Sequence, residues 1–546
     1  MEKDMKKDTK KKFSWKISLE SEIEKARFFT FLAFIGIITI LAWQSDDAYH
    51  GYVMAKHLVE GDGFVYNIGE RSSASSCPLF TLVIAAAYFV TREMFFTSLI
   101  VCIAFSAAAY YILVYKFCKT KDQIILCFLA LTGSTAFISY TTSGLENSML
   151  FFLSVLFLKI YFDHEKFTGK QMLILALVFS AIALTRMDAV LMFIPVIVYV
   201  YLAKREKTSF FGAVGIGLLG LLPFILWEIF SLFYFGFPFP NTAYVKLGTD
   251  IALIEYIKRG IWYGIFTLLN DMLVIIVPAV FMVISILMKK AKYLYLSAGV
   301  MLYVLYVIYI GGDFMMGRHF TVIFLISLCS LNALFNREKD CFAKIRKYQM
   351  SFGVIVVAGM VYTYTFAAVI GSQYLFGHEI GSSISDEREV YQRTTGLFNN
   401  VRSLISTGEL CIEDTWNYQS TDEVRELNLI GNITDNSPGI LVYYNSDLYL
   451  NDTYGLGDPF LSKLPAIKDE NWRVGHMKRA LPEGYRETIQ TGENVIENKD
   501  LAEYYDVIHL ITRGDLFDKD RIRAIIDWNL GKYDYLIENY EASLSE

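Results

Sequence analysis

The stretch FFTFLAFIGIITILAWQSDD, residues 28–47, places a pair of acidic side chains directly after a long apolar run. An apolar run of about 16 residues approaches the length that an α-helix needs to cross a bilayer. Asp46 and Asp47 therefore stand where the chain leaves the membrane, a position where carboxylates are costly and usually functional. A carboxylate there is well placed to accept a proton from a hydroxyl group, which predicts a catalytic pair. A solvated pair that only ends a helix is the alternative.

The composition is that of a chain whose main solvent is lipid. Hydrophobic residues make up 54% of the 546 residues, aromatic residues 16% and charged residues only 19%. These values predict a polytopic membrane protein and exclude a nucleic-acid-binding protein. The net charge of −6 combines a basic N-terminus with an acidic last third, so it says little about partners. The seven cysteines lack the spacing of a zinc site, and we expect them to pack in the interior.

Apolar runs recur along the first two thirds of the chain. Further spans are predicted at 94–116, 122–140, 145–162, 171–185, 187–203, 209–235, 265–288, 291–311, 319–336 and 350–371. The run 78–90 is shorter than a span and is expected to lie along the membrane interface. The basic loops then fall on the side of the N-terminus, as the positive-inside rule requires. We therefore predict an α-helical transmembrane domain over 1–371, with about eleven spans, a first extracytoplasmic loop over 44–93 and a cytoplasmic N-terminus.

The last third of the chain is predicted to be a separate soluble domain. From about Gly371 onward charged residues become frequent, and loops separate short apolar runs. The runs GILVYYN (439–445) and YYDVIHLIT (504–512) are predicted strands, and 521–530 is predicted to be helical. This alternation predicts an extracytoplasmic α/β domain over 372–546, packed on the outer face of the membrane.

Five polar motifs fall in the outer loops of this topology. They are DDAYH (46–50), TSGLEN (142–147), LTRMD (184–188), FPFPNTAYVK (237–246) and GGDFMMGRH (311–319). A charge at the edge of lipid costs about 2 to 3 kcal/mol on insertion scales, so such side chains usually face a wet cavity. Each motif alone could be a helix terminus. Five motifs on one rim, with both signs of charge, predict a functional site.

These motifs resemble those of bacterial GT-C glycosyltransferases of the arabinofuranosyltransferase type, which serve actinobacterial cell walls and related pilin or surface glycans. DDAYHGYVMAKHLVEGDGFVYNIGE (46–70) resembles the first outer loop of that family. The similarity continues in order through SGLEN (143–147), ALTRMD (183–188), FPNTAYVK (239–246), GGDFMMGR (311–318), DTYGLGDPFLSKLPA (452–466) and VGHMKRALPEGY (474–485). The chain departs from the family pattern at Val53, where an arginine is common, and at SASSCPLF (73–80), where a stretch like EGYTSPLW is common.

The resemblance implies a GT-C fold and a membrane-bound pentosyltransferase. Such an enzyme transfers D-arabinofuranose from a polyprenyl phosphate carrier to an acceptor glycan or a glycosylated surface protein. Its place is the bacterial cytoplasmic (inner) membrane, where membrane lipid surrounds the carrier and the active site faces outward. In this interpretation Asp46 or Asp47 accepts the proton of the incoming sugar hydroxyl.

A leaving phosphate needs positive charge, and three outer-face cations lie in the family-like motifs. Arg318 is the first choice for the phosphate, with Lys246 and Arg186 beside it. Contact with lipid headgroups is the alternative for Arg318 and Lys246. The candidates for substrate binding are Asp313, Glu146, Tyr49, His476 and Arg479. Asp313 and Glu146 could instead pair with the cations, and His476 and Arg479 could instead form a surface on which the soluble domain docks.

No metal or other cofactor is predicted, because the carboxylates lack EF-hand spacing and nearby cations can stabilise a phosphate. A divalent metal that bridges Asp46, Asp47 and the donor phosphate is the alternative. Two other functions also remain open. One is an oligosaccharyltransferase or ligase of a lipid-linked glycan, and the other is a transporter or flippase of a lipid-linked sugar. Transporters tend to have internal repeats and polar residues near the midplane, whereas this chain keeps its charges at one rim.

The predicted topology puts the basic loop around Lys119 in the cytoplasm. We expect alkaline phosphatase fused at Lys119 to be inactive, because that enzyme folds to its active form only outside the cytoplasm. The same reporter fused within 372–546 should be active and serves as the control. An active fusion at Lys119 would contradict the eleven-span topology.

Overall fold

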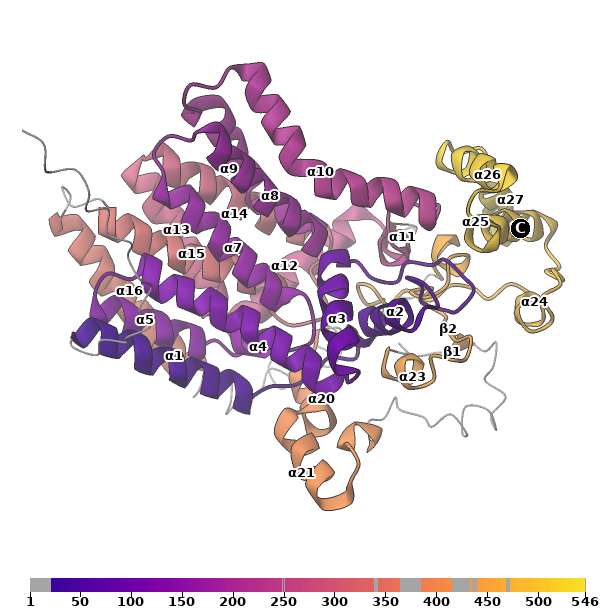
Figure 1. The fold of residues 1–546 in the computed structure, drawn as a ribbon, viewed down its shortest axis with the longest axis horizontal. Helices are drawn as coiled ribbons and strands as arrows, with labels where there is room; N and C mark the ends of the chain where they lie inside the picture. The colour runs from indigo at the N-terminus through magenta and orange to yellow at the C-terminus, as the bar shows by residue number, and fades with distance from the viewer. Residues whose placement is uncertain are drawn as a thin grey trace, which may run out of the picture.

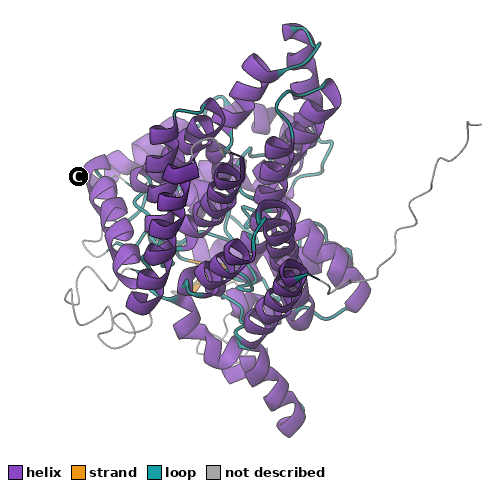
Figure 2. Cartoon of the chain, turned by 90° about the vertical axis from the view of Figure 1, so that its left-hand side faces the viewer, coloured by secondary structure: helices purple, strands orange, loops and turns teal. Residues whose placement is uncertain are grey.

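The computed structural model of the chain describes residues 21–247, 249, 251–337, 342–363, 384–414, 433–434, 439–467 and 472–545. Almost all regular structure in these residues is helical (Figure 2). The helices up to Tyr362 form a bundle with its loops, and the later segments gather mainly at one end of it (Figure 1). The basic segment 1–20 lies outside the described residues, and so do residues 364–383, which contain the end of the last predicted span and the start of the predicted soluble domain.

The bundle and its loops contain the first half of the helices. Their bounds are α1 (Glu22–Ile40), α2 (Ala48–Glu60), α3 (Pro78–Thr91), α4 (Phe95–Ile112), α5 (Lys121–Thr132), α6 (Thr135–Ser139), α7 (Asn147–Asp163), α8 (Gly169–Thr185), α9 (Ile194–Tyr199), α10 (Phe210–Tyr234), α11 (Asn241–Leu247), α12 (Leu253–Asn270), α13 (Leu273–Met288), α14 (Ala291–Tyr309), α15 (Arg318–Arg337) and α16 (Phe342–Tyr362). The side chains of α15 are buried nearly throughout, and this helix packs against α7 and α13. It therefore forms the centre of the bundle.

Four of the described helical segments are long and apolar enough to cross a membrane. By length and composition they are Phe95–Phe117, Phe210–Tyr234, Ala291–Tyr309 and Arg318–Arg337. A fifth is counted if the bent pair α12 and α13 is taken as one span. The α-helical character and the apolar helices expected from the composition are thus present, whereas eleven spans are not seen among the described helices.

Two predicted spans are interrupted by polar residues that contact each other. The run 265–288 is not one straight helix, because α12 and α13 are bent by 106° relative to each other. Between them lies Asp271, which accepts hydrogen bonds from Ser134 Oγ at 2.6 Å and from the Ala136 amide at 2.9 Å. The run 122–140 is split into α5 and α6, and the side chain of Ser134 caps the second of these. Asp271 at one break and Ser134 at the other thus satisfy each other's need for a hydrogen-bond partner in the apolar bundle.

The first outer loop contains two helices, of which α2 is amphipathic. The second, α3, has 14 residues and is shorter than a membrane span, as predicted for the run 78–90. Val53 and Met54 of α2 are buried together with Leu441 and Val442, which belong to the C-terminal third of the chain. The last third of the chain therefore covers this loop.

The C-terminal third, called the tail below, is also mostly helical. Its helices and strands are α20 (Glu387–Thr395), α21 (Leu397–Thr407), β1 (Ile433–Thr434), α23 (Gly439–Tyr444), β2 (Asn451–Asp452), α24 (Tyr485–Thr491), α25 (Lys499–Arg513), α26 (Lys519–Asn529) and α27 (Asp534–Ser545). In the described residues β1 and β2 form a single two-stranded parallel sheet. Figure 1 shows α24 to α27 at the end of the molecule that is farthest from α1.

The two runs predicted as strands, 439–445 and 504–512, are helical instead. In α25 the buried residues Leu501, Tyr504 and Ile508 follow one another at the three- and four-residue spacing of a helix face. The tyrosine and isoleucine content favoured a strand, but this spacing is that of a helix. The predicted α/β layer is therefore wrong for the described part of the tail.

The tail is attached to the end of α10 by a buried arginine. Arg521 Nη2 donates hydrogen bonds to the carbonyl oxygens of Phe233 and Tyr234, both at 2.9 Å. These carbonyls lie in the last turn of α10, where a cation is favourable because the helix dipole is negative there. Arg521 thus fixes α26 against the bundle.

Candidate functional site

Charged side chains gather where the ends of α7, α8 and α15 meet the first outer loop. We call this group the charge cluster. It consists of Asp47, Glu146, Arg186, Asp188, Lys246, Asp313 and Arg318. All but Asp188 were candidate site residues from the sequence, and the structure brings these residues together although they are distant in the chain.

Glu146 connects the arginines of the charge cluster. Its Oε1 accepts hydrogen bonds from Arg186 Nη1 and Arg318 Nη2, each at 2.9 Å. The Glu146 side chain is only 4% exposed, and a buried carboxylate needs such pairing because its desolvation is costly. Glu146 precedes α7, Arg186 follows α8 and Arg318 begins α15. One carboxylate therefore holds three helix ends together. Of the two roles given above for Glu146, substrate binding and pairing with the cations, this contact corresponds to pairing.

Arg186 is fully engaged within the charge cluster. Its Nε donates to Asp188 Oδ1 at 2.8 Å and its Nη2 to Asp188 Oδ2 at 3.2 Å, while Nη1 binds Glu146. Such two-pronged pairing is strong and fixes the guanidinium plane. Arg186 is therefore placed to position its neighbours rather than to bind the predicted phosphate.

Arg318 is held firmly on one side and loosely on the other. Its Nη2 binds Glu146, but its Nη1 lies 3.8 Å from Asp313 Oδ2 and 3.4 Å from Met315 Sδ. Asp313 Oδ2 also lies 3.5 Å from His319 Nε2. The Nη1 edge of Arg318 can therefore bind an incoming oxyanion while the opposite edge stays anchored.

Lys246 is a cation whose ammonium group makes no hydrogen bond or ion pair with the residues that the structure describes. Solvent reaches this side chain, yet the surrounding protein lowers its pKa by burial. Asp313 acts against this shift of the pKa, whereas Arg186 and Arg318 add to it. An anion bound beside Lys246 would favour its charged form, so this lysine is suited to an incoming phosphate.

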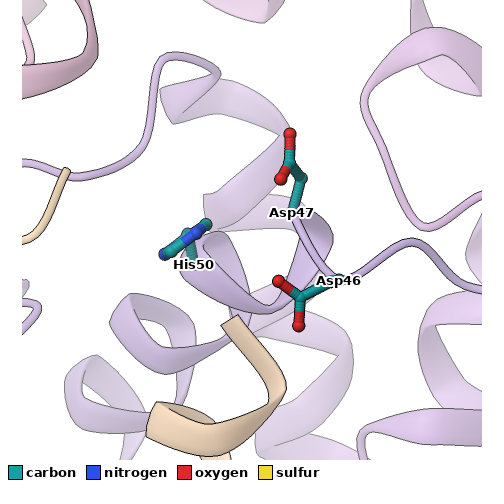
Figure 3. Close-up of side chains that lie close together, drawn as sticks. All are labelled: Asp46, Asp47 and His50. Carbon is teal, nitrogen blue, oxygen red and sulfur yellow. The ribbon is translucent and has the colours of Figure 1, made fainter. Parts of the chain in front are cut away.

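The two neighbouring aspartates have different surroundings (Figure 3). Asp46 is 2% exposed, and its carboxylate accepts hydrogen bonds from the amides of Ile440 at 2.8 Å and Gly439 at 3.3 Å. These amides begin α23, where unpaired N–H groups favour a carboxylate. A side chain at position 439 would place its Cβ 2.2 Å from the Asp46 carbonyl oxygen, which is why a glycine is needed there. Asp46 therefore fixes the tail to the first outer loop.

Asp47 is the aspartate that remains available for chemistry. It is half-buried, and its carboxylate has no hydrogen bond or ion pair with any described residue. Burial raises the pKa of Asp47, while His476, Arg318 and Arg473 act to lower it and Asp313 acts to raise it. A carboxylate with a raised pKa is a stronger base than an ordinary aspartate.

Tail residues complete the surroundings of Asp47. The ring of His476 packs edge-on against Phe314, with 4.4 Å between the ring centroids. Burial lowers the pKa of His476 to about 4, with Arg473 adding to the shift and Asp47 opposing it. A neutral imidazole at pH 7 can donate or accept a hydrogen bond with a sugar. Arg473 Nη2 lies 3.4 Å from Glu387 Oε1, so this cation is anchored within the tail.

Two predicted substrate-binding residues lie in the interior and not in the charge cluster. Tyr49 is 1% exposed, and its hydroxyl donates to Gln44 Oε1 at 2.5 Å. Arg479 is 2% exposed and donates to the carbonyl oxygens of Met477 at 2.6 Å and Val245 at 2.7 Å. Arg479 thus fixes the tail to α11, which is the docking role given above as the alternative.

Three charged or titratable residues of the site were not candidates from the sequence. Asp188 and His319 are the last residues of the motifs LTRMD and GGDFMMGRH. Their place in these motifs could have identified them as site residues. Arg473 lies just outside the quoted motifs, and only its nearness to His476 in the chain pointed to it. Its approach to Asp47 depends on how the tail folds over the loop.

Asp46, Asp47 and His50 could together hold a metal ion. One ligand atom from each lies within 4.8 Å of the others, and carboxylate and imidazole ligands suit several divalent metals. Such an ion would compete with the α23 amides for Asp46 and with the Tyr66 hydroxyl, which lies 3.1 Å from His50 Nδ1. Arg318 and Arg473 supply positive charge near Asp47 without a metal, and the absence of a metal stays a prediction.

No known protein family, curated protein or solved structure matches this chain. The resemblance to arabinofuranosyltransferases therefore depends on the quoted motifs. The function is inferred below from the chemistry that the charge cluster can perform.

The different roles of the two aspartates predict different effects on stability. Asp46→Asn should destabilise the protein by about 1 to 3 kcal/mol, because it removes charge-assisted hydrogen bonds from buried amides. Asp47→Asn, the matched control at the next position, should lie within about 0.5 kcal/mol of the wild type. Unfolding midpoints in detergent measure both changes. Equal effects of the two substitutions would contradict the assignment.

Proposed function

We propose that the chain is a GT-C glycosyltransferase that transfers a sugar from a polyprenyl phosphate donor to a glycan or glycosylated protein outside the cytoplasm. The sugar is D-arabinofuranose by resemblance. Asp47 carries the proposal, because it is a half-buried carboxylate that lies among cations and has no hydrogen bond or ion pair with the residues that the structure describes. The proposal includes a bacterial inner-membrane location, eleven spans, a cytoplasmic N-terminus and an extracytoplasmic active site and tail.

The arrangement of the cations suits a lipid-linked donor. The isoprenoid part of such a donor stays in the bilayer, and its phosphate lies at the level of the headgroups. Lys246 and the Nη1 edge of Arg318 are available for the phosphate oxygens, whereas Glu146, which Arg186 also binds, holds Arg318 in position. A point charge and a planar guanidinium together match a phosphate that carries one bulky substituent.

The proposed reaction is a single displacement of phosphate at the anomeric carbon. Asp47 accepts the proton of the acceptor hydroxyl while the oxygen of that hydroxyl forms a bond to the anomeric carbon. The bond from the carbon to the phosphate oxygen breaks, and its electron pair leaves with polyprenyl phosphate. Lys246 and Arg318 stabilise the charge that grows on the phosphate, and neutral His476 is available to hydrogen-bond a sugar hydroxyl. A well-placed general base contributes roughly 10²- to 10⁴-fold to the rate.

Release of polyprenyl phosphate tests this function. Purified protein incubated with polyprenyl phosphoryl arabinose and a glycan acceptor should release polyprenyl phosphate and lengthen the acceptor by one sugar. Asp47→Asn should lower the rate at least about 100-fold, because it removes the base. Lys246→Met should raise the KM for the donor. Asp62→Asn and Lys258→Met, which change exposed charges on α2's exit loop and on α12, serve as matched controls and should leave both values unchanged.

The outcomes separate the competing functions. A transporter or flippase would move the lipid-linked sugar across a vesicle without releasing polyprenyl phosphate. An oligosaccharyltransferase or ligase would require a donor with a larger glycan and would not use the single sugar. Either result, or full activity of Asp47→Asn, would contradict the proposal.

A further inference from the structure

A cavity that is separate from the charge cluster lies where the tail meets α11. Its volume is about 290 Å³, near the lower end of ligand sites, which range over roughly 300 to 1,000 Å³. Its walls include three aromatic side chains, one amine and two carboxylates, which are Tyr244, Tyr504, Trp528, Lys463, Asp534 and Glu538. A cavity of this size is suited to one ring-sized group.

The aromatic walls come from three helices and are fixed by contacts with one another. Trp528 Nε1 donates to the Tyr504 hydroxyl at 3.0 Å. The Tyr244 and Trp528 rings meet edge to face, with their centroids 5.8 Å apart. Rigid aromatic side chains provide a large apolar surface with polar tips, and this combination suits the mixed C–H and hydroxyl surface of a sugar ring.

An internal lysine already occupies the cation-binding position of this cavity. Lys463 Nζ lies 3.8 Å from the Phe237 ring centroid and 4.7 Å from that of Tyr244. The same ammonium donates to the Pro459 carbonyl oxygen at 2.8 Å. The aromatic faces that would attract a ligand ammonium are thus in use, which disfavours a cationic ligand.

Two carboxylates border the cavity on α27. Asp534 and Glu538 stand one helical turn apart, both are exposed, and neither forms an ion pair with the described residues. Carboxylates accept hydrogen bonds from hydroxyl groups and repel anions such as phosphate. Together with the lysine, they favour a neutral ligand with several hydroxyl groups.

The short helix α11 lies between this cavity and the charge cluster. Tyr244 lines the cavity and Lys246 belongs to the charge cluster, and residues two positions apart on a helix point in different directions. A helix is about 10 to 12 Å wide, so a ligand of several linked sugars could occupy both sites at once. We propose that the cavity binds a neutral sugar unit of the acceptor glycan, at a distance from the unit that receives the transferred sugar. The acceptor role depends on the transferase function proposed above, whereas sugar binding by itself does not.

Binding is tested with the full-length protein in detergent and without a donor. Calorimetric titration with a linear arabinofuranose hexasaccharide should show binding to the wild type. The double variant Asp534→Asn/Glu538→Gln keeps the size of both side chains and should bind about tenfold more weakly. The control Glu493→Gln/Asp520→Asn removes two exposed carboxylates elsewhere in the tail and should bind like the wild type. No binding to the wild type, or equal binding to all three proteins, would overturn the proposal.

The acceptor role is tested separately in the polyprenyl phosphate release assay. Asp534→Asn/Glu538→Gln should raise the KM for the acceptor about tenfold and leave the KM for the donor unchanged. An unchanged acceptor KM would overturn the acceptor role. Hexasaccharide binding that depends on these carboxylates, found together with no polyprenyl phosphate release by the wild type, would support the sugar site and contradict the transferase function.

Discussion

The carboxylate of Glu146 holds two guanidinium groups that reach it from different helices. The apolar bundle cannot solvate these three charged groups, so the attraction between them must offset the free energy that their removal from water costs. Removal of one partner from a buried ion pair costs about 3 to 5 kcal/mol, because a charge is left without a counter-ion. The position of Arg318 follows from this contact, and the surroundings of Asp313, Lys246 and Asp47 follow from the position of Arg318. The charge cluster thus joins three helix ends, and we propose that it also binds an anion.

The tail contributes to the site through contacts that fix its place on the bundle. Asp46 binds the first amides of α23, Arg479 binds carbonyls beside α11, and Arg521 binds carbonyls at the end of α10. These contacts bring His476 close enough to Asp47 for the two side chains to interact electrostatically. Two adjacent aspartates therefore have different surroundings, since the tail binds Asp46, whereas Asp47 has no hydrogen bond or ion pair with the described residues.

The sequence was most informative where a local pattern decides the structure. Apolar runs predicted α10, α14 and α15, and motif positions predicted most of the charge cluster. The break at Asp271 was not predictable, because it depends on Ser134, a residue far away in the chain. The tail helix α25 was mistaken for a strand because its residue types outweighed its spacing. The roles of Asp46 and Asp47 could not be separated either, since the amide of Ile440 decides between them.

The charge cluster should receive the donor phosphate beside Asp47. A cryo-electron microscopy structure of the wild-type protein in lipid nanodiscs with bound polyprenyl phosphate tests this most directly. We predict that the phosphate lies within hydrogen-bonding distance of Lys246 Nζ and Arg318 Nη1, with the Asp47 carboxylate facing the position vacated by the sugar. A phosphate bound elsewhere on the bundle, without contact to Lys246 or Arg318, would contradict the proposed function.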